Sequence, residues 1–177
     1  MKLKLLLCAA CLGLASRAFA LTLAEGIAVE PPAGQQVTYQ VLPFYDTSKK
    51  VLARWSGDQL SYYVSLQALP AGSTDPDAYI QSLVNELKAA GGSVAVGRRS
   101  TYQAAQGFRG IAQVLGRPEA NPATPAMVVH VITDGQHAYL AIATGVETTA
   151  ISPDELLRAS TELLRSVHAS GVEAPIP

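Results

Sequence analysis

Two helix-initiation signals stand among runs of strand-like sequence, and this pattern most constrains how the chain can fold. Asp75-Pro76-Asp77 combines a capping residue, a proline suited to the first helical position, and an acid that complements the positive helix end. In Ser152-Pro153-Asp154-Glu155, the first and last residues have the spacing of a capping box. Apolar residues recur at helical spacing after each signal and glycines follow, so helices are predicted over residues 75–90 and 152–168. Their predicted apolar stripes are Tyr79, Ile80, Leu83, Val84 and Leu87, and Leu156, Leu157, Leu163, Leu164 and Val167.

The remaining chain has the alternation and turn composition of short strands. Ser56-Gly57-Asp58 is a turn composition, and Asp134-Gly135 is typical of a two-residue hairpin loop. Three prolines make residues 116–125 a loop. Strands joined by tight turns are antiparallel, so the predicted fold is α+β, an antiparallel sheet of hairpins with two main helices packed on it. The predicted strands cover residues 21–29, 37–42, 51–55, 60–69, 93–102, 108–115, 127–133 and 136–144.

The first twenty residues have the pattern of a secretory signal peptide. Lys2 and Lys4 precede an apolar run over residues 5–15, and Ala18 and Ala20 supply the small residues that a signal peptidase requires. The apolar run is shorter than the ~20 residues that a membrane-spanning helix needs. We therefore expect cleavage after Ala20, a single domain over residues 21–170, a flexible tail over 171–177, and a periplasmic or secreted protein with no integral membrane span.

Both cysteines, Cys8 and Cys11, lie inside this leader. Lipidation at Cys11 is the alternative, but Cys8 then occupies a position where lipoprotein signals have an aliphatic residue. After cleavage at Ala20 the chain has no disulfide and no thiol, and its stability depends on its hydrophobic core.

The charge balance disfavours a nucleic-acid partner. The 177-residue chain has 13 basic and 14 acidic groups, and three of the basic groups lie in the leader. The remaining 10 basic groups against 14 acids give residues 21–177 a net charge of −4. Phosphate-backbone binding depends on clustered Lys and Arg, which an acidic chain does not favour.

The order of the elements resembles that of the PsbP-like and DcrB-like secreted α/β/α family over about residues 23–168. The resemblance implies a PsbP-like layered sandwich and a non-catalytic envelope protein, and it transfers no functional residues. Gln35 stands where members often have tryptophan. The segments that carry the resemblance are Pro31-Pro32-Ala33-Gly34, the helix at 75–90, Phe108-Arg109-Gly110-Ile111, Tyr139-Leu140-Ala141-Ile142 and Leu163-Leu164-Arg165-Ser166-Val167.

His130 and His137 are the weak candidates for metal ligands. With Asp134-Gly135 as a two-residue loop, Ile132 faces His137 and His130 faces Tyr139, so both histidines share one face of the hairpin. Zinc needs three or four protein ligands, so we favour two partly exposed sheet histidines over a metal site. The register directs Val129, Val131, Ala138, Leu140 and Ile142 towards the main core, and Val128, His130, Ile132, His137 and Tyr139 away from it.

Other residue groups favour structural roles. Arg98, Arg99, Arg109 and Arg117 are either an anion or lipid-headgroup patch or, as we favour, charges that protect a sheet edge. Trp55, Tyr62 and Tyr63 are a possible recognition surface, but alternation places one tyrosine in the core, which favours packing.

Three functional hypotheses follow. The first is a non-catalytic periplasmic accessory or binding protein that acts through protein–protein contacts, with no catalytic residue and no cofactor. The second is an envelope metal-binding protein or enzyme centred on His130 and His137. The third is an immunity or inhibitor protein for a secreted toxin, which the acidic chain permits.

Overall fold

The computed structural model describes residues 21–24, 27–30, 36–38, 51–56, 61–90, 94–116, 127–145 and 151–169. Several sequence predictions lie outside these residues: the leader and its cleavage site, the turn at Gly57, the glycines after the first helix, the proline-rich loop with Arg117, and the C-terminal tail.

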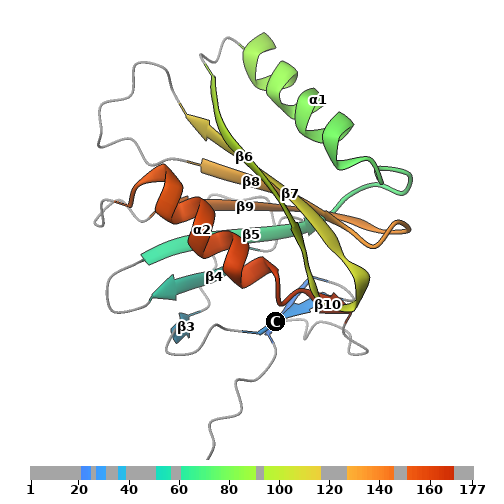
Figure 1. Ribbon diagram of the computed structural model, residues 1–177, viewed down its shortest axis with the longest axis vertical. Helices are drawn as coiled ribbons and strands as arrows, with labels where there is room; N and C mark the ends of the chain where they lie inside the picture. Colours follow the sequence, from blue (N-terminus) through green and yellow to red (C-terminus); the bar gives the residue numbers. More distant parts are fainter. Residues whose placement is uncertain are drawn as a thin grey trace, which may run out of the picture.

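A seven-stranded antiparallel sheet forms the body of the described structure (Figure 1). The strand order is β3-β4-β5-β9-β8-β7-β6, so β6 ends the sheet on one side. Two α-helices of the described chain accompany it, as the α+β prediction requires. The strands are β3 (Gln36–Thr38), β4 (Val51–Ser56), β5 (Ser61–Ala68), β6 (Ala95–Gln103), β7 (Arg109–Gly116), β8 (Met127–Thr133) and β9 (Ala138–Gly145).

A second, three-stranded sheet corrects two predictions. The single strand expected over residues 21–29 is instead the antiparallel pair β1 (Leu21–Ala24) and β2 (Ile27–Val29). The second helix ends at Leu164 rather than near residue 168, and the chain after it forms β10 (His168–Ala169), which pairs with β2. The order is β1-β2-β10. A two-residue strand depends on a distant partner, which no local pattern reveals.

Both helices start as the sequence predicts. In α1 (Pro76–Ala89), Oδ1 of the cap Asp75 accepts hydrogen bonds from the backbone N–H groups of Asp77 and Ala78 at 3.0 and 3.2 Å. In α2 (Pro153–Leu164), Ser152 and Glu155 form the predicted capping box. Proline occupies the first position of each helix, where its missing N–H costs nothing.

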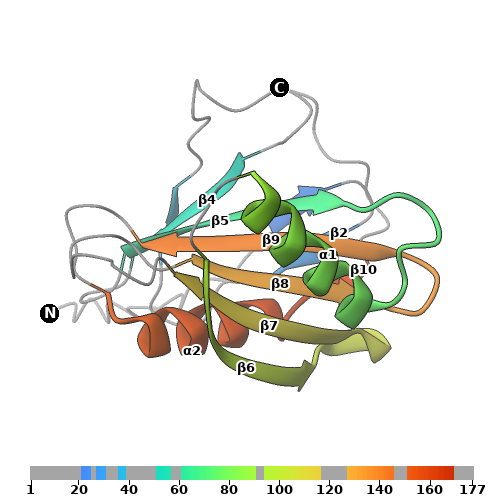
Figure 2. The ribbon, with the colours of Figure 1, turned by 90° about the horizontal axis from the view of Figure 1, so that it is seen from above.

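The two helices cover opposite faces of the sheet, as Figure 2 shows. Leu156, Leu163 and Leu164 of α2 are fully buried in the larger core cluster, whereas α1 buries mainly Ile80 and Val84 in a smaller one. The sheet therefore has two buried faces. Our prediction of one core-facing and one outward face for the last hairpin is wrong: Val128 and Ile132 belong to the larger core under α2, while Val129, Val131 and Leu140 pack beneath α1.

The register of the β8–β9 hairpin also differs from the prediction by two residues. Thr133 pairs with Ala138 and Ile132 with Tyr139, so four residues form the loop instead of two. Oδ1 of Asp134 accepts from the N–H groups of Gln136 and His137 at 2.8 and 2.7 Å. The Asp134 side chain thereby stabilises a wider turn than the Asp-Gly pair alone indicates.

Candidate functional site

Among the strands of the sheet whose side-chain burial the structure describes, the edge strand β6 is the most exposed. Most of its side chains are exposed, and Val96 is the large hydrophobic residue most open to solvent among the described residues, at 52%. Within the described chain it has a single hydrogen-bonded neighbour, β7. This position agrees with the expectation that Arg98 and Arg99 lie at a sheet edge.

A bulge interrupts this edge between Val96 and Arg99. The buried side chain of Gln113 on β7 donates through Nε2 to the carbonyl oxygens of Gly97 and Arg98, at 2.8 and 3.3 Å. The amide thus satisfies backbone acceptors that the interrupted ladder leaves free. Bulges and edge charges both discourage uncontrolled strand pairing, so residues 96–98 of β6 are protected.

The arginines of β6 reach the two helices on opposite faces. Arg98 lies 3.7 Å from Asp154 of α2, and Arg99 forms an ion pair with Asp77 of α1. The structure therefore places Arg98 and Arg99 on opposite faces of the sheet rather than in one patch, and Arg117 lies outside the described residues. Arg109, at the start of β7, lies on the α1 side with Ile111 and is exposed.

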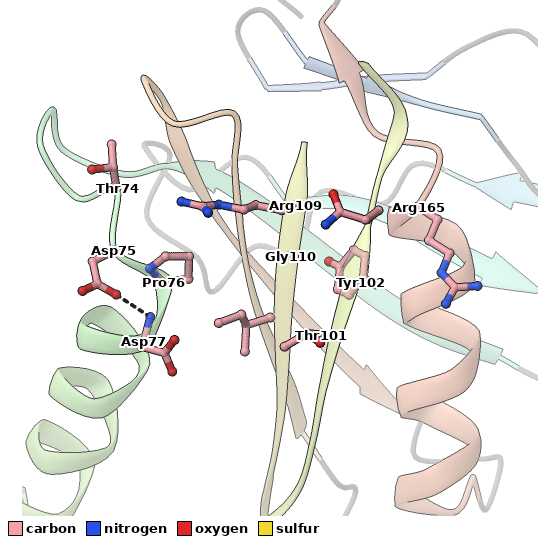
Figure 3. A pocket seen from close by; sticks show the side chains of 11 residues that line it. Thr74, Asp75, Pro76, Asp77, Thr101, Tyr102, Arg109, Gly110 and Arg165 are labelled. Atoms are coloured by element: carbon pink, nitrogen blue, oxygen red, sulfur yellow. Dashed lines mark hydrogen bonds between the residues drawn. The ribbon is translucent and has the colours of Figure 1, made fainter. Parts of the chain in front are cut away.

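A cleft of about 980 Å³ surrounds the end of β6. Thr101 and Tyr102 come from β6 itself, and Asp75 lines the cleft from the start of α1. In Figure 3, Arg109 points towards the start of α1, whereas Arg165 lies on the other side of the β6–β7 pair. Among the described residues, neither arginine forms an ion pair.

A second groove, of about 630 Å³, runs between β6 and α2. Arg98 and Ser100 line it from β6, Thr161 and Glu162 line it from α2, and Arg165 lines it from the C-cap of that helix. The hydroxyl of Thr161 is buried and has no hydrogen-bond partner among the described atoms. Arg165 lines both the cleft and the groove, although most of the cleft lining comes from the α1 side, so β6 has a polar recess on each face.

His130, the first metal candidate, lies in the core and not in the partly exposed position that we favoured. It is fully buried, with Nδ1 3.2 Å from the Tyr102 hydroxyl and Nε2 2.9 Å from Oγ of Ser160. Tyr102 comes from β6, Ser160 from α2 and His130 from β8, so the imidazole joins the edge strand to the helix across β7. Burial lowers the pKa of His130 to about 3, which keeps the ring neutral.

The hydrogen bonds determine which ring nitrogen carries the proton. Ser160 Oγ donates to the carbonyl oxygen of Leu156 at 2.6 Å, so its oxygen accepts a hydrogen bond from Nε2–H of His130. Nδ1 is then the acceptor for the Tyr102 hydroxyl. A nucleophilic serine requires the reverse, an unprotonated nitrogen facing its hydroxyl. The arrangement is therefore a buried polar network with satisfied partners.

His137, the second candidate, lies in the exposed hairpin turn and does not share a site with His130. Its Nδ1 is 3.2 Å from Oδ2 of Asp134. No cluster of three or more His, Cys, Asp or Glu side chains suited to a metal ion occurs among the residues that the structure describes.

Sequence reasoning missed Tyr102 and Ser160 as the partners of His130. One signal was present: Ser160 follows Leu156 by four positions and interrupts the apolar stripe of α2, where a hydroxyl requires a partner. Of the aromatic residues, Tyr62 is buried and Tyr63 half-buried, in line with the predicted packing role. Trp55 pairs with Tyr62 in register.

No family model matches the chain, and neither does any curated protein. The chain is similar to the solution structure of cyanobacterial PsbP (CyanoP) from Synechocystis sp. PCC 6803. The TM-score is 0.46 and the sequence identity 10%, over 82% of this chain and 87% of that one. That protein comes from the PsbP group that the order of elements resembles, while the DcrB-like part of the resemblance stays a prediction. The likeness is one of chain arrangement and says nothing of function. No helix in the described part of the chain is long and apolar enough to cross a membrane.

Proposed function

We propose that this chain is a non-catalytic binding protein of the cell envelope that acts through contact with another protein. The exposed edge of β6, with polar recesses beside it, is the observation that carries the proposal. A free strand edge offers backbone donors and acceptors to a partner, and side recesses can add specificity.

The hydrogen-bond directions at His130 support a binding role over a catalytic one. The single N–H group of the neutral ring donates to the Ser160 hydroxyl, and that hydroxyl donates to the carbonyl oxygen of Leu156. In a turnover assay on a panel of hydrolase substrates, we expect wild type and His130→Gln to give the same background and no activity that depends on His130. Activity that this substitution abolishes would contradict the proposal and favour the enzyme hypothesis.

The envelope location rests on the leader sequence. We propose cleavage after Ala20 and a single folded domain over residues 21–170. Mass spectrometry of the exported protein should give Leu21 as the first residue. A chain that begins at Cys11 with a lipid adduct would refute this cleavage site.

The protein–protein role can be tested by crosslinking in intact cells, followed by purification of the tagged full chain. We expect one partner to be enriched relative to an exported control protein of similar size, with stoichiometric recovery when both are co-expressed. Absence of any crosslinked partner at native expression would overturn the proposed function.

A further inference from the structure

The outer side of β6 has a defined set of backbone groups. The Ala104 N–H donates to the carbonyl oxygen of Phe108 at 2.8 Å, across the same register in which Tyr102 pairs with Gly110. Alternate residues of an antiparallel ladder direct their N–H and C=O groups to opposite sides. The groups of Arg99, Thr101 and Gln103 therefore point away from β7.

This outward stretch lies beyond the bulge, where the pairing of β6 with β7 is regular from Arg99 to Gln103. The bulge, whose backbone is hydrogen-bonded by the Gln113 side chain, protects the edge at the other end of the strand. The last three residues of the regular stretch, Thr101 to Gln103, also line the cleft. The regular stretch is thus the part of the edge best suited to accept a further strand.

Arg109 and Arg165, which form no ion pair within the described chain, lie on opposite sides of such an added strand. Arg109 is on the α1 side and Arg165 on the α2 side (Figure 3). Side chains of a strand alternate between the two faces of its sheet. Two carboxylates that are an odd number of positions apart, such as neighbours, therefore lie on opposite faces of the added strand. One would point towards Arg109 and the other towards Arg165.

We propose that residues 99–103 of β6 accept an extended segment of a partner protein as an additional strand, and that this segment carries two carboxylates at an odd spacing. This inference rests on the proposed function and specifies its surface. Backbone hydrogen bonds supply the general affinity, and Arg109 and Arg165 select the acidic side chains. Asp75 and Asp77 also line the cleft, but Asp77 is paired with Arg99 and Asp75 caps α1, so within the described chain Arg109 and Arg165 are the cleft charges that an acidic segment can pair.

Charge disfavours a second copy of this chain as the occupant. The sequence of β6, AVGRRSTYQ, contains no Asp or Glu, so a second β6 strand supplies no carboxylate to Arg109 or Arg165. It adds further arginines to the same edge instead. A concentration-dependent dimer that Thr101→Pro abolishes would overturn the choice of partner.

The test uses a displayed library of random peptides nine residues long, the length of β6, selected on the folded protein. Thr101→Pro removes one outward N–H without removing a bond to β7, and proline is tolerated at such edge positions. Thr101→Val keeps that N–H and is the matched control. Circular dichroism and thermal unfolding establish that both variants fold.

We expect enriched peptides to carry Asp or Glu at odd spacing and to bind Thr101→Pro at least about tenfold more weakly than Thr101→Val. Arg109→Gln and Arg165→Gln should each weaken binding about threefold, within the range for exposed ion pairs. Equal binding to the proline and valine variants, or selection without enrichment over an unrelated protein, would overturn strand addition.

Crosslinking of the envelope partner to wild type and to Thr101→Pro distinguishes the failure of one proposal from the failure of the other. If crosslinking recovers the same partner with wild type and Thr101→Pro, the binding function stands and the β6 surface is wrong. If wild type recovers no partner, the proposed function itself fails.

Discussion

A Cβ atom on Gly110 would overlap the ring of Tyr102, because the two residues pair in register on β7 and β6 and the ring lies across the glycine. The ring cannot move aside freely, since its hydroxyl is bound to buried His130. Gly110→Ala should therefore lower the free energy of unfolding by about 1–3 kcal/mol, the usual cost of overpacking. Urea denaturation measures the change.

Gly116 on the same strand is the control for this prediction. A Cβ atom there meets nothing within 4 Å, so Gly116→Ala should cost less than Gly110→Ala. In a Tyr102→Ala background the penalty at Gly110 should largely disappear. Equal effects of the two alanines would show that the ring of Tyr102 is not held in place.

Stability should depend on pH through His130. The pKa of its ring falls from an ordinary 6.5 to about 3 in the folded protein because the ring is buried. Between these pH values the unfolded chain binds a proton that the folded chain does not, so unfolding becomes easier as the pH decreases. The contribution is fully present above about pH 6.5, and roughly 5 kcal/mol is lost by about pH 3.

His130→Gln separates this effect from that of the carboxylates, because glutamine does not titrate. Denaturation at a series of pH values should give a shallower decline for the variant than for wild type over this window. Parallel profiles for the two proteins would contradict the assignment of the decline to His130.

Truncation of Leu163 to alanine should cost about 2–5 kcal/mol, because the side chain is fully buried in the core beneath α2. Loss of the cap in Ser152→Ala should cost only about 0.5–2 kcal/mol. Thermal unfolding ranks the two variants. A melting temperature unchanged by Leu163→Ala would mean that α2 does not contribute its apolar stripe to the fold.

Removal of the Arg98–Asp154 ion pair should change stability by no more than about 1 kcal/mol. Both side chains are 71% exposed, so water and salt weaken their attraction. Arg98→Gln, Asp154→Asn and the double variant form a cycle whose coupling energy is measured by denaturation. A coupling well above this limit would mean that the pair is far better shielded than its exposure indicates.

Features encoded by neighbouring residues were predictable from the sequence. Both helix starts depend on residues within one turn, and the structure confirms them at Asp75 and Ser152. The predicted two-residue loop between β8 and β9 was wrong, because the Asp134 side chain stabilises a four-residue turn that competes with the two-residue Asp-Gly turn.

Features that need partners distant in sequence were not predictable. β10 exists through its pairing with β2, and the environment of His130 depends on Tyr102 and Ser160, which lie 28 and 30 positions away. The candidate site also depends on elements that are distant in sequence. The arginines of β6 were visible in the sequence, whereas the recesses beside them require α1 and α2 to be placed on opposite faces.

Arg98 and Arg99 are consecutive in the chain, yet each forms an ion pair with the second residue of a different helix, Asp154 or Asp77. A slip of β6 by one residue along β7 would exchange their faces, break both pairs and move Tyr102 away from His130. Each ion pair is weak alone, but a slipped strand loses them together with the buried network. The register of β6, the last strand of the sheet, is therefore fixed by contacts on both faces of the sheet.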